Sequence, residues 1–88
     1  MAVVWIPGLL RDLTGGQQTV DVPGKTVRDV IAAMEERFPG MQERLIEDGR
    51  LMPSITVIVD GEPGNMRLRQ PLREDSEVHF LPAISGGI

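Results

Sequence analysis

A single long stretch with helical periodicity constrains this fold more than any other feature. Thr26 is suited to cap the first turn of a helix, and Asp29 is placed to return a hydrogen bond as in a capping box. Pro39-Gly40 then ends the pattern. Between these signals, the apolar residues that follow helical spacing and share one face are Val27, Val30, Ile31, Met34 and Phe38.

Short apolar and β-branched runs flank this helix on both sides. Such runs are typical of strands. The run before Asp60-Gly61 is the clearest, because this dipeptide is strongly favoured in tight hairpin turns. The four expected strands cover residues 2–6 (AVVWI), 17–22, 55–59 (ITVIV) and 77–81 (EVHFL).

The order of these elements predicts one architecture. A short second helix is expected at 41–46, and the looser segment 66–72 is interpreted as able to include a short strand. A hairpin, a crossover helix and a returning set of strands make an α+β roll. We therefore predict a β-grasp domain over residues 1–82, with a mixed sheet, one main helix packed on one face, and neighbouring first and last strands. A flexible tail, 83–88, follows.

Composition excludes several classes of function. The chain of 88 residues has no cysteine, which rules out disulfides, thiolate metal sites and a cysteine nucleophile. No apolar run approaches the roughly 20 residues that span a bilayer, so we expect no membrane contact and a cytoplasmic location. The net charge of −4 argues against nucleic acid as the main partner and favours a protein with a basic patch.

Several motifs resemble sites but have simpler interpretations. The segment PGKT at 23–26 looks like the end of a phosphate-binding loop, but Thr19 stands where that loop needs glycine. His79, the only histidine, has no second ligand nearby, so we expect no metal site and a partly buried structural role. Trp5 lies in an apolar strand and is interpreted as packing rather than recognition.

No residues suggest catalysis by the chain itself. No nucleophile, base and orienting group occur together at suggestive spacing. The acidic cluster is expected to be solvated or to contact a basic partner, and it consists of Glu74, Asp75 and Glu77. We expect no catalytic residue and no enzyme activity.

Paired glycines, Gly86-Gly87, follow the last expected strand. One interpretation is a frayed terminus. The other is functional: without Cβ, glycine lets the backbone thread a channel too narrow for side chains, and its carboxylate is open to attack. A separate enzyme would activate that carboxylate and join it to sulfur or to an amine.

The chain resembles the ubiquitin-like sulfur carriers of the MoaD and ThiS type. The resemblance spans almost the whole length, through VVWIPGLLRDLTGG, the helix opening at Thr26, ITVIVDGE, and most specifically PLREDSEVHFLPAISGG. The segment LLRDLTGGQ looks most like the branch that supplies sulfur for cysteine biosynthesis.

This resemblance implies a mechanism. Gly87 would be adenylated with ATP by an E1-like activating enzyme and converted to a thiocarboxylate, while Gly86 and Ser85 belong to the threading tail. A sulfur-accepting enzyme of cysteine synthase type, working with pyridoxal phosphate, is the expected recipient, with molybdopterin or thiamine synthesis as alternatives. The chain would bind neither cofactor itself.

Ile88 departs from the family pattern, because it holds the Gly87 carboxyl in a peptide bond. The resemblance implies that a zinc metalloprotease of the JAMM type removes it. A ubiquitin-like modifier joined to lysines through Gly87 shares the same features, as does an unmodified interaction subunit.

The partner interface is expected where the last strand ends, at Phe80, Leu81 and Pro82. Adjacent residues alternate faces of a strand, so one of Phe80 and Leu81 enters the core and the other points outward. The sequence leaves open which one does so.

Overall fold

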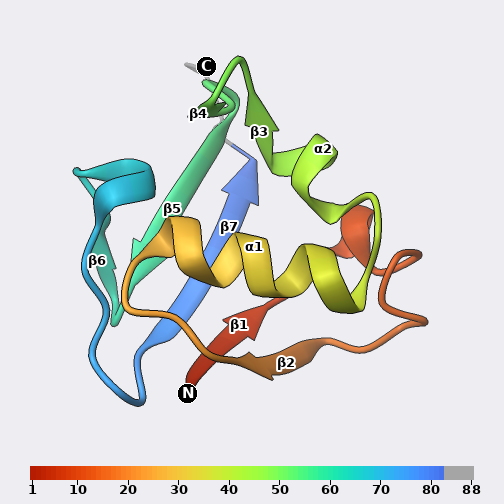
Figure 1. The fold of residues 1–88 in the computed structure, drawn as a ribbon, viewed down its shortest axis with the longest axis horizontal. Helices are drawn as coiled ribbons and strands as arrows, with labels where there is room; N and C mark the ends of the chain where they lie inside the picture. Colours follow the sequence, from red (N-terminus) through yellow and green to blue (C-terminus); the bar gives the residue numbers. More distant parts are fainter. Residues whose placement is uncertain (83–88) are drawn as a thin grey trace.

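The computed structural model describes residues 1–82. Seven strands, two α-helices and two short 3₁₀ helices make up this part (Figure 1). In chain order they are β1 (Ala2–Trp5), η1 (Gly8–Leu10), β2 (Thr19–Val22), α1 (Val27–Arg37), α2 (Met41–Leu45), β3 (Ile46–Glu47), β4 (Arg50–Leu51), β5 (Ile55–Val59), β6 (Glu62–Pro63), η2 (Arg67–Arg69) and β7 (Glu77–Pro82).

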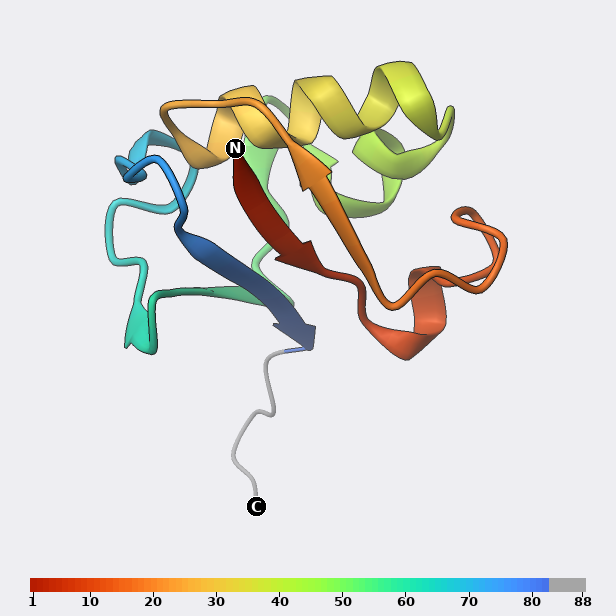
Figure 2. The same ribbon diagram turned by 90° about the horizontal axis from the view of Figure 1, so that it is seen from below.

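Five of the strands form one mixed sheet in the order β2-β1-β7-β5-β6. The first and last strands of the domain pair in parallel, whereas the other neighbours are antiparallel. The predicted β-grasp roll, with its mixed sheet and adjacent end strands, is therefore confirmed. Figure 2 shows α1 and α2 on one side of this sheet, while the other side carries no α-helix among residues 1–82.

The core lies between α1 and the inner face of the sheet. The predicted stripe is confirmed, since Val27, Val30, Ile31 and Met34 are fully buried and Phe38 is half-buried at the helix end. Inward residues of the central strands meet this stripe; they are Val4, Val57, Val78 and Phe80. Each such side chain contributes about 1.5–3 kcal/mol on burial.

The start of α1 differs slightly from the predicted capping box. The Thr26 hydroxyl oxygen accepts a hydrogen bond from the Asp29 N–H at 3.2 Å, as expected. The Asp29 carboxylate, however, accepts from the N–H of Lys25 at 3.3 Å and not from that of Thr26. The return bond is therefore made one residue earlier along the chain.

The sequence predicted the turn of one short hairpin and missed a second hairpin. Asp60 and Gly61 both have positive φ, 53° and 83°, as a tight turn of the predicted kind requires. The similar pair Asp48 and Gly49 joins β3 to β4, a hairpin that the sequence did not predict because each strand has only two residues. The segment 66–72, interpreted as able to include a short strand, forms η2 and a single isolated bridge between Pro71 and Thr26, and the short strand β6 precedes it.

Close packing explains why the PGKT motif has glycine at position 24, without a bound phosphate. A Cβ at this position would lie 2.8 Å from Val30 Cγ2 and 2.9 Å from the Val30 backbone nitrogen. The chain passes this close to α1 because it must turn from β2 into the helix.

Among residues 1–82, no helix has the length and apolar character needed to cross a membrane.

We predict that Gly24→Ala destabilises the domain by about 1–3 kcal/mol, because the new methyl group overlaps backbone atoms that cannot move freely. Urea unfolding checks this value. Gly8→Ala is the matched control, since a Cβ at Gly8 meets no atom within 4 Å. Equal unfolding midpoints for the two variants would contradict the close approach at Gly24.

Candidate functional site

The last strand presents one apolar side chain to solvent and one to the core. Phe80 is 1% exposed and Leu81 is 45% exposed. The structure thus resolves which of the two faces outward, and Phe80 is removed from the expected interface. Pro82 closes β7, where its backbone is paired with that of Ile55.

Trp5 lies beside His79 on the same outward face. The two residues are register partners in the parallel pair of β1 and β7. Their rings stack, with centroids 5.2 Å apart and planes inclined by 7°. Trp5 is 39% exposed, so the expected packing is made against His79 on the outer face of the sheet and not in the buried core. Val4, its neighbour, takes the core position, because successive strand residues alternate faces.

These side chains belong to a continuous surface, here called the outer sheet patch. Ile58 pairs with His79 across β5 and β7, and both are half-buried on the face away from α1. Apolar groups gathered at one place on a charged domain mark contact surfaces. The patch consists of Val3, Trp5, Ile58, His79 and Leu81.

A hollow of about 300 Å³ adjoins the patch at the ends of β1 and β7. Its lining includes Trp5, His79 and Leu81 of the patch together with Pro7 and Arg11. The Arg11 Nε–H donates to the Ile6 carbonyl at 3.3 Å, which holds a positive charge beside the hollow. The chain leaves β7 at this point toward residue 83.

Asp60 fixes the opposite end of β7. Its carboxylate accepts hydrogen bonds from the Glu77 N–H at 2.9 Å and from the Ser76 hydroxyl at 2.8 Å. The Ser76 oxygen in turn accepts from the Arg73 N–H at 2.8 Å. The bond from Glu77 and then that from Ser76 lower the pKa of Asp60; burial opposes them less strongly, and the charge of Arg73 adds the smallest lowering.

The remaining candidates from the sequence are the acidic cluster, a possible metal site and the tail. Glu74, Asp75 and Glu77 are all exposed, as expected for solvated carboxylates. Within residues 1–82, no three His, Asp or Glu side chains lie together in a way that could hold a metal ion. The tail residues Ser85, Gly86, Gly87 and Ile88, like the rest of 83–88, lie outside the described residues.

Sequence reasoning missed two members of this site, Trp5 and Arg11. The run AVVWI is apolar throughout, so it hides the alternation of faces. The expected pairing of the first and last strands brings Trp5 near His79, but only the register seen in the structure makes the two residues direct partners. Arg11 follows η1 in a connecting segment whose position no pattern in the sequence specifies.

The chain matches the model of the ThiS family over residues 4–87. It is 34% identical over 89 residues to the sulfur carrier protein CysO of Mycobacterium bovis, covering 96% of each chain. It is also 33% identical over 64 residues to small archaeal modifier protein 3 of Haloferax volcanii, covering 70% of each.

The fold has a similar solved counterpart. A chain in the crystal structure of the Amycolatopsis orientalis BexX/CysO complex superimposes with a TM-score of 0.91 and 32% identity. The match covers 99% of this chain and 100% of that one.

We predict that Asp60→Asn lowers stability at neutral pH and that its deficit shrinks in acid. Because folding lowers the Asp60 pKa, the stabilising contribution is complete above the ordinary value of 3.8 and is lost as the pH falls through the folded-state value. Urea unfolding of both proteins between neutral pH and pH values below 3.8 checks this dependence. The exposed Asp75→Asn is the control, and a deficit that is constant with pH would contradict the assignment.

Proposed function

Because the chain belongs to the ThiS family, we propose that it is a sulfur carrier whose Gly87 carboxylate is adenylated and then converted to a thiocarboxylate. The observation that carries this proposal is the family match over residues 4–87, which runs through Gly86-Gly87. The similarity to CysO sulfur carriers over nearly the whole chain supports it.

The chemistry needs a separate enzyme. A Gly87 carboxylate oxygen attacks the α-phosphorus of ATP, forming an acyl adenylate and releasing pyrophosphate. A sulfur nucleophile then attacks the acyl carbon and displaces AMP, leaving sulfur bound to the carrier. ATP belongs to the E1-like activating enzyme, and the carrier contributes recognition and the reacting carboxylate.

The outer sheet patch is the surface best suited to recognition by that enzyme. A partner that holds residues beyond Pro82 must lie close to the end of β7, where Leu81 and Trp5 are exposed. Full burial of a leucine side chain contributes about 1.5–3 kcal/mol, and Leu81 still has close to half of its surface available. Arg11 beside the hollow favours an acidic group on the partner.

Ile88 must be removed before Gly87 can react, since an amide-bound carboxyl cannot be adenylated. We assign this step to a JAMM-type zinc metalloprotease. The zinc ion of this step belongs to the protease.

Cysteine synthesis is the proposed destination of the sulfur. The two similar CysO proteins support this branch over molybdopterin or thiamine synthesis. The acceptor would be an aminoacrylate that a cysteine synthase type enzyme forms on pyridoxal phosphate from an activated serine, in the cytoplasm. The thiocarboxylate sulfur would attack its β-carbon, and hydrolysis of the resulting thioester would free Gly87.

A second candidate function has its own support. The similarity to small archaeal modifier protein 3 favours a protein modifier in which Gly87 forms an amide with lysines of target proteins. Both functions use the same activated carboxylate and differ in the acceptor, so high-mass conjugates in a lysate would favour the modifier.

The first test of the sulfur-carrier proposal is the intact mass of the untagged protein isolated from its native cells. We expect loss of Ile88 and replacement of one oxygen by sulfur at Gly87. Gly87→Pro should abolish this mass change while leaving the circular dichroism spectrum unaltered. Retention of Ile88 when protease and activating enzyme are present, or normal sulfur loading of Gly87→Pro, would refute the proposal.

We predict that Leu81→Asp weakens binding to the activating enzyme by at least about tenfold, because a carboxylate replaces an apolar contact in the interface. Its unfolding free energy should stay within about 0.5 kcal/mol of wild type, since the side chain is exposed. Gln42→Asp adds the same charge at an exposed position on α2 and should bind within about twofold of wild type. Similar losses for both variants, measured by calorimetry, would exclude the patch as the docking surface.

A further inference from the structure

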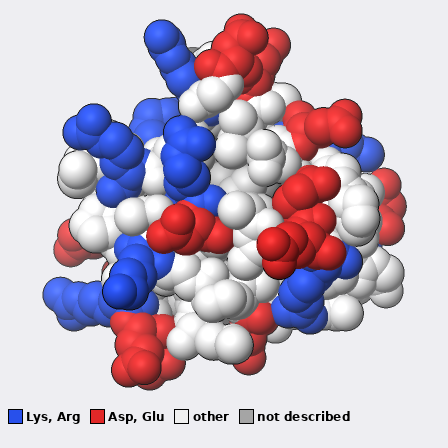
Figure 3. Space-filling view, in the orientation of Figure 1, with Lys and Arg blue, Asp and Glu red and all other residues white. Residues whose placement is uncertain are grey.

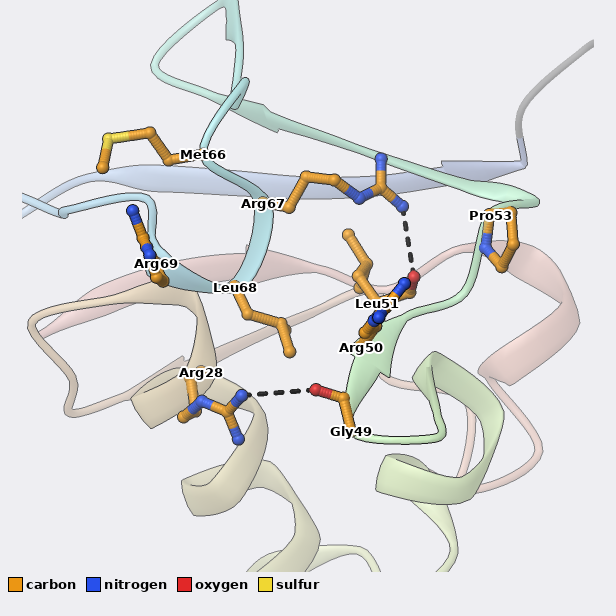
Figure 4. Close-up of a pocket in the computed structure, with 9 residues that line it drawn as sticks. All are labelled: Arg28, Gly49, Arg50, Leu51, Pro53, Met66, Arg67, Leu68 and Arg69. Carbon is orange, nitrogen blue, oxygen red and sulfur yellow. Dashed lines mark hydrogen bonds between the residues drawn. The ribbon is translucent and has the colours of Figure 1, made fainter.

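A second and larger hollow lies on the helix side of the sheet. Its volume is about 610 Å³, and arginines from three separate elements line it. Arg28 comes from α1, Arg50 from β4, and Arg67 and Arg69 from η2 (Figure 4). We call this hollow the arginine pocket.

The lining of the arginine pocket concentrates positive charge. Four of the chain's nine Lys and Arg residues line it although the net charge is −4, and no Asp or Glu of residues 1–82 is among the lining residues. Figure 3 shows several Lys and Arg side chains on this part of the surface, with Asp or Glu side chains beside them near the start of α1. Crowding of like charges favours an anionic partner.

Two of these guanidinium groups are held in place by uncharged acceptors. The Arg28 Nη2 group donates to the Gly49 carbonyl at 3.4 Å. The Arg67 Nη2 group lies 2.9 Å from the Met52 carbonyl oxygen and 3.0 Å from that of Ile55. These carbonyls orient the side chains without neutralising them. Arg50 and Arg69 are exposed, and their guanidinium groups make no hydrogen bond or ion pair with residues 1–82.

The arginine pocket also has an apolar part. Leu51 and Leu68 are 3% and 6% exposed and line it from β4 and η2. Met66, at its edge, is 50% exposed, and Pro53 is exposed as well. Apolar surface surrounded by guanidinium groups suits a chain segment that carries both carboxylates and an apolar anchor.

This combination distinguishes among anionic ligands. Small anions are held by convergent donors, whereas here the nearest donors of Arg28 and Arg67 are already directed to carbonyls. An extended nucleic acid would meet the acidic remainder of a chain with net charge −4. An acidic protein segment needs contact only over the pocket itself.

We propose that the arginine pocket docks an acidic segment of a partner protein, with carboxylates on Arg50 and Arg69 and an apolar side chain beside Met66. The pocket is lined by residues of α1, β4 and η2, whereas the outer sheet patch lies on the sheet face away from α1, so one partner can occupy each at the same time. The docking does not depend on the chemistry at Gly87, and its test is separate from that of the sulfur-carrier function.

The experiment uses the full chain, labelled with ¹⁵N, and a synthetic peptide with two leucines flanked by glutamates. We expect amide shift changes at Gly49–Leu51 and Met66–Arg69, and none at Trp5 or His79. A peptide with glutamine at every glutamate should cause no shifts. Raised salt should weaken binding, because exposed charges are screened over about 10 Å at 0.1 M ionic strength.

Charge-reversal variants give the quantitative test. Each exposed ion pair is worth up to about a fivefold change in affinity. The double variant Arg50→Glu/Arg69→Glu should therefore bind at least about tenfold more weakly. Arg50→Gln/Arg69→Gln removes both charges without reversing them and should show a smaller loss of affinity in the same direction, which keeps the test valid if the charge-reversal variant misfolds. Lys25→Glu, exposed and outside the pocket, is the matched control and should bind within about twofold of wild type.

Four results would overturn the proposal. They are absence of shifts at the pocket, equal losses in Lys25→Glu and the double variant, displacement of the peptide by equimolar inorganic phosphate or a single-stranded oligonucleotide, and self-association that the double variant abolishes. The last would assign the pocket to a second copy of this chain.

Discussion

The parallel pairing of β1 with β7 is the contact on which the functional end of this domain depends. It places Trp5 beside His79 and fixes the position along the sheet at which Leu81 faces solvent. It also buries the inward residues of both strands under α1. Asp60 secures the start of β7 through Ser76 and Glu77, so the strand leading into the tail is fixed at its beginning and paired on both sides.

Residues with strong local signals were predictable from the sequence. The Thr26 cap, the apolar stripe of α1 and the Asp60-Gly61 turn each follow from contacts within a few residues. The outward Trp5 was not, because AVVWI gives no alternation and its environment is set by a strand more than seventy residues away. Two-residue strands such as β3 lack any pattern long enough to detect.

The two surfaces differ in how they are assembled, which explains why only one was anticipated. The outer sheet patch follows the alternation of strands, so the sequence could place Leu81 and Phe80 on opposite faces without deciding between them. The arginine pocket joins α1, β4 and η2, and Arg67 reaches it from a backbone with φ of 56°. Such convergence depends on tertiary packing alone.

The pairing of residues 3–5 with 77–79 has a consequence for how the protein is made. These contacts join the two ends of the domain, and contacts of large sequence separation slow folding. During synthesis, β1 and β5 lack their shared neighbour until β7 has left the ribosome. The strand that completes the sheet is also the strand that leads into the tail, so under the proposed function a nascent chain would offer its glycines to an activating enzyme only after the domain has closed.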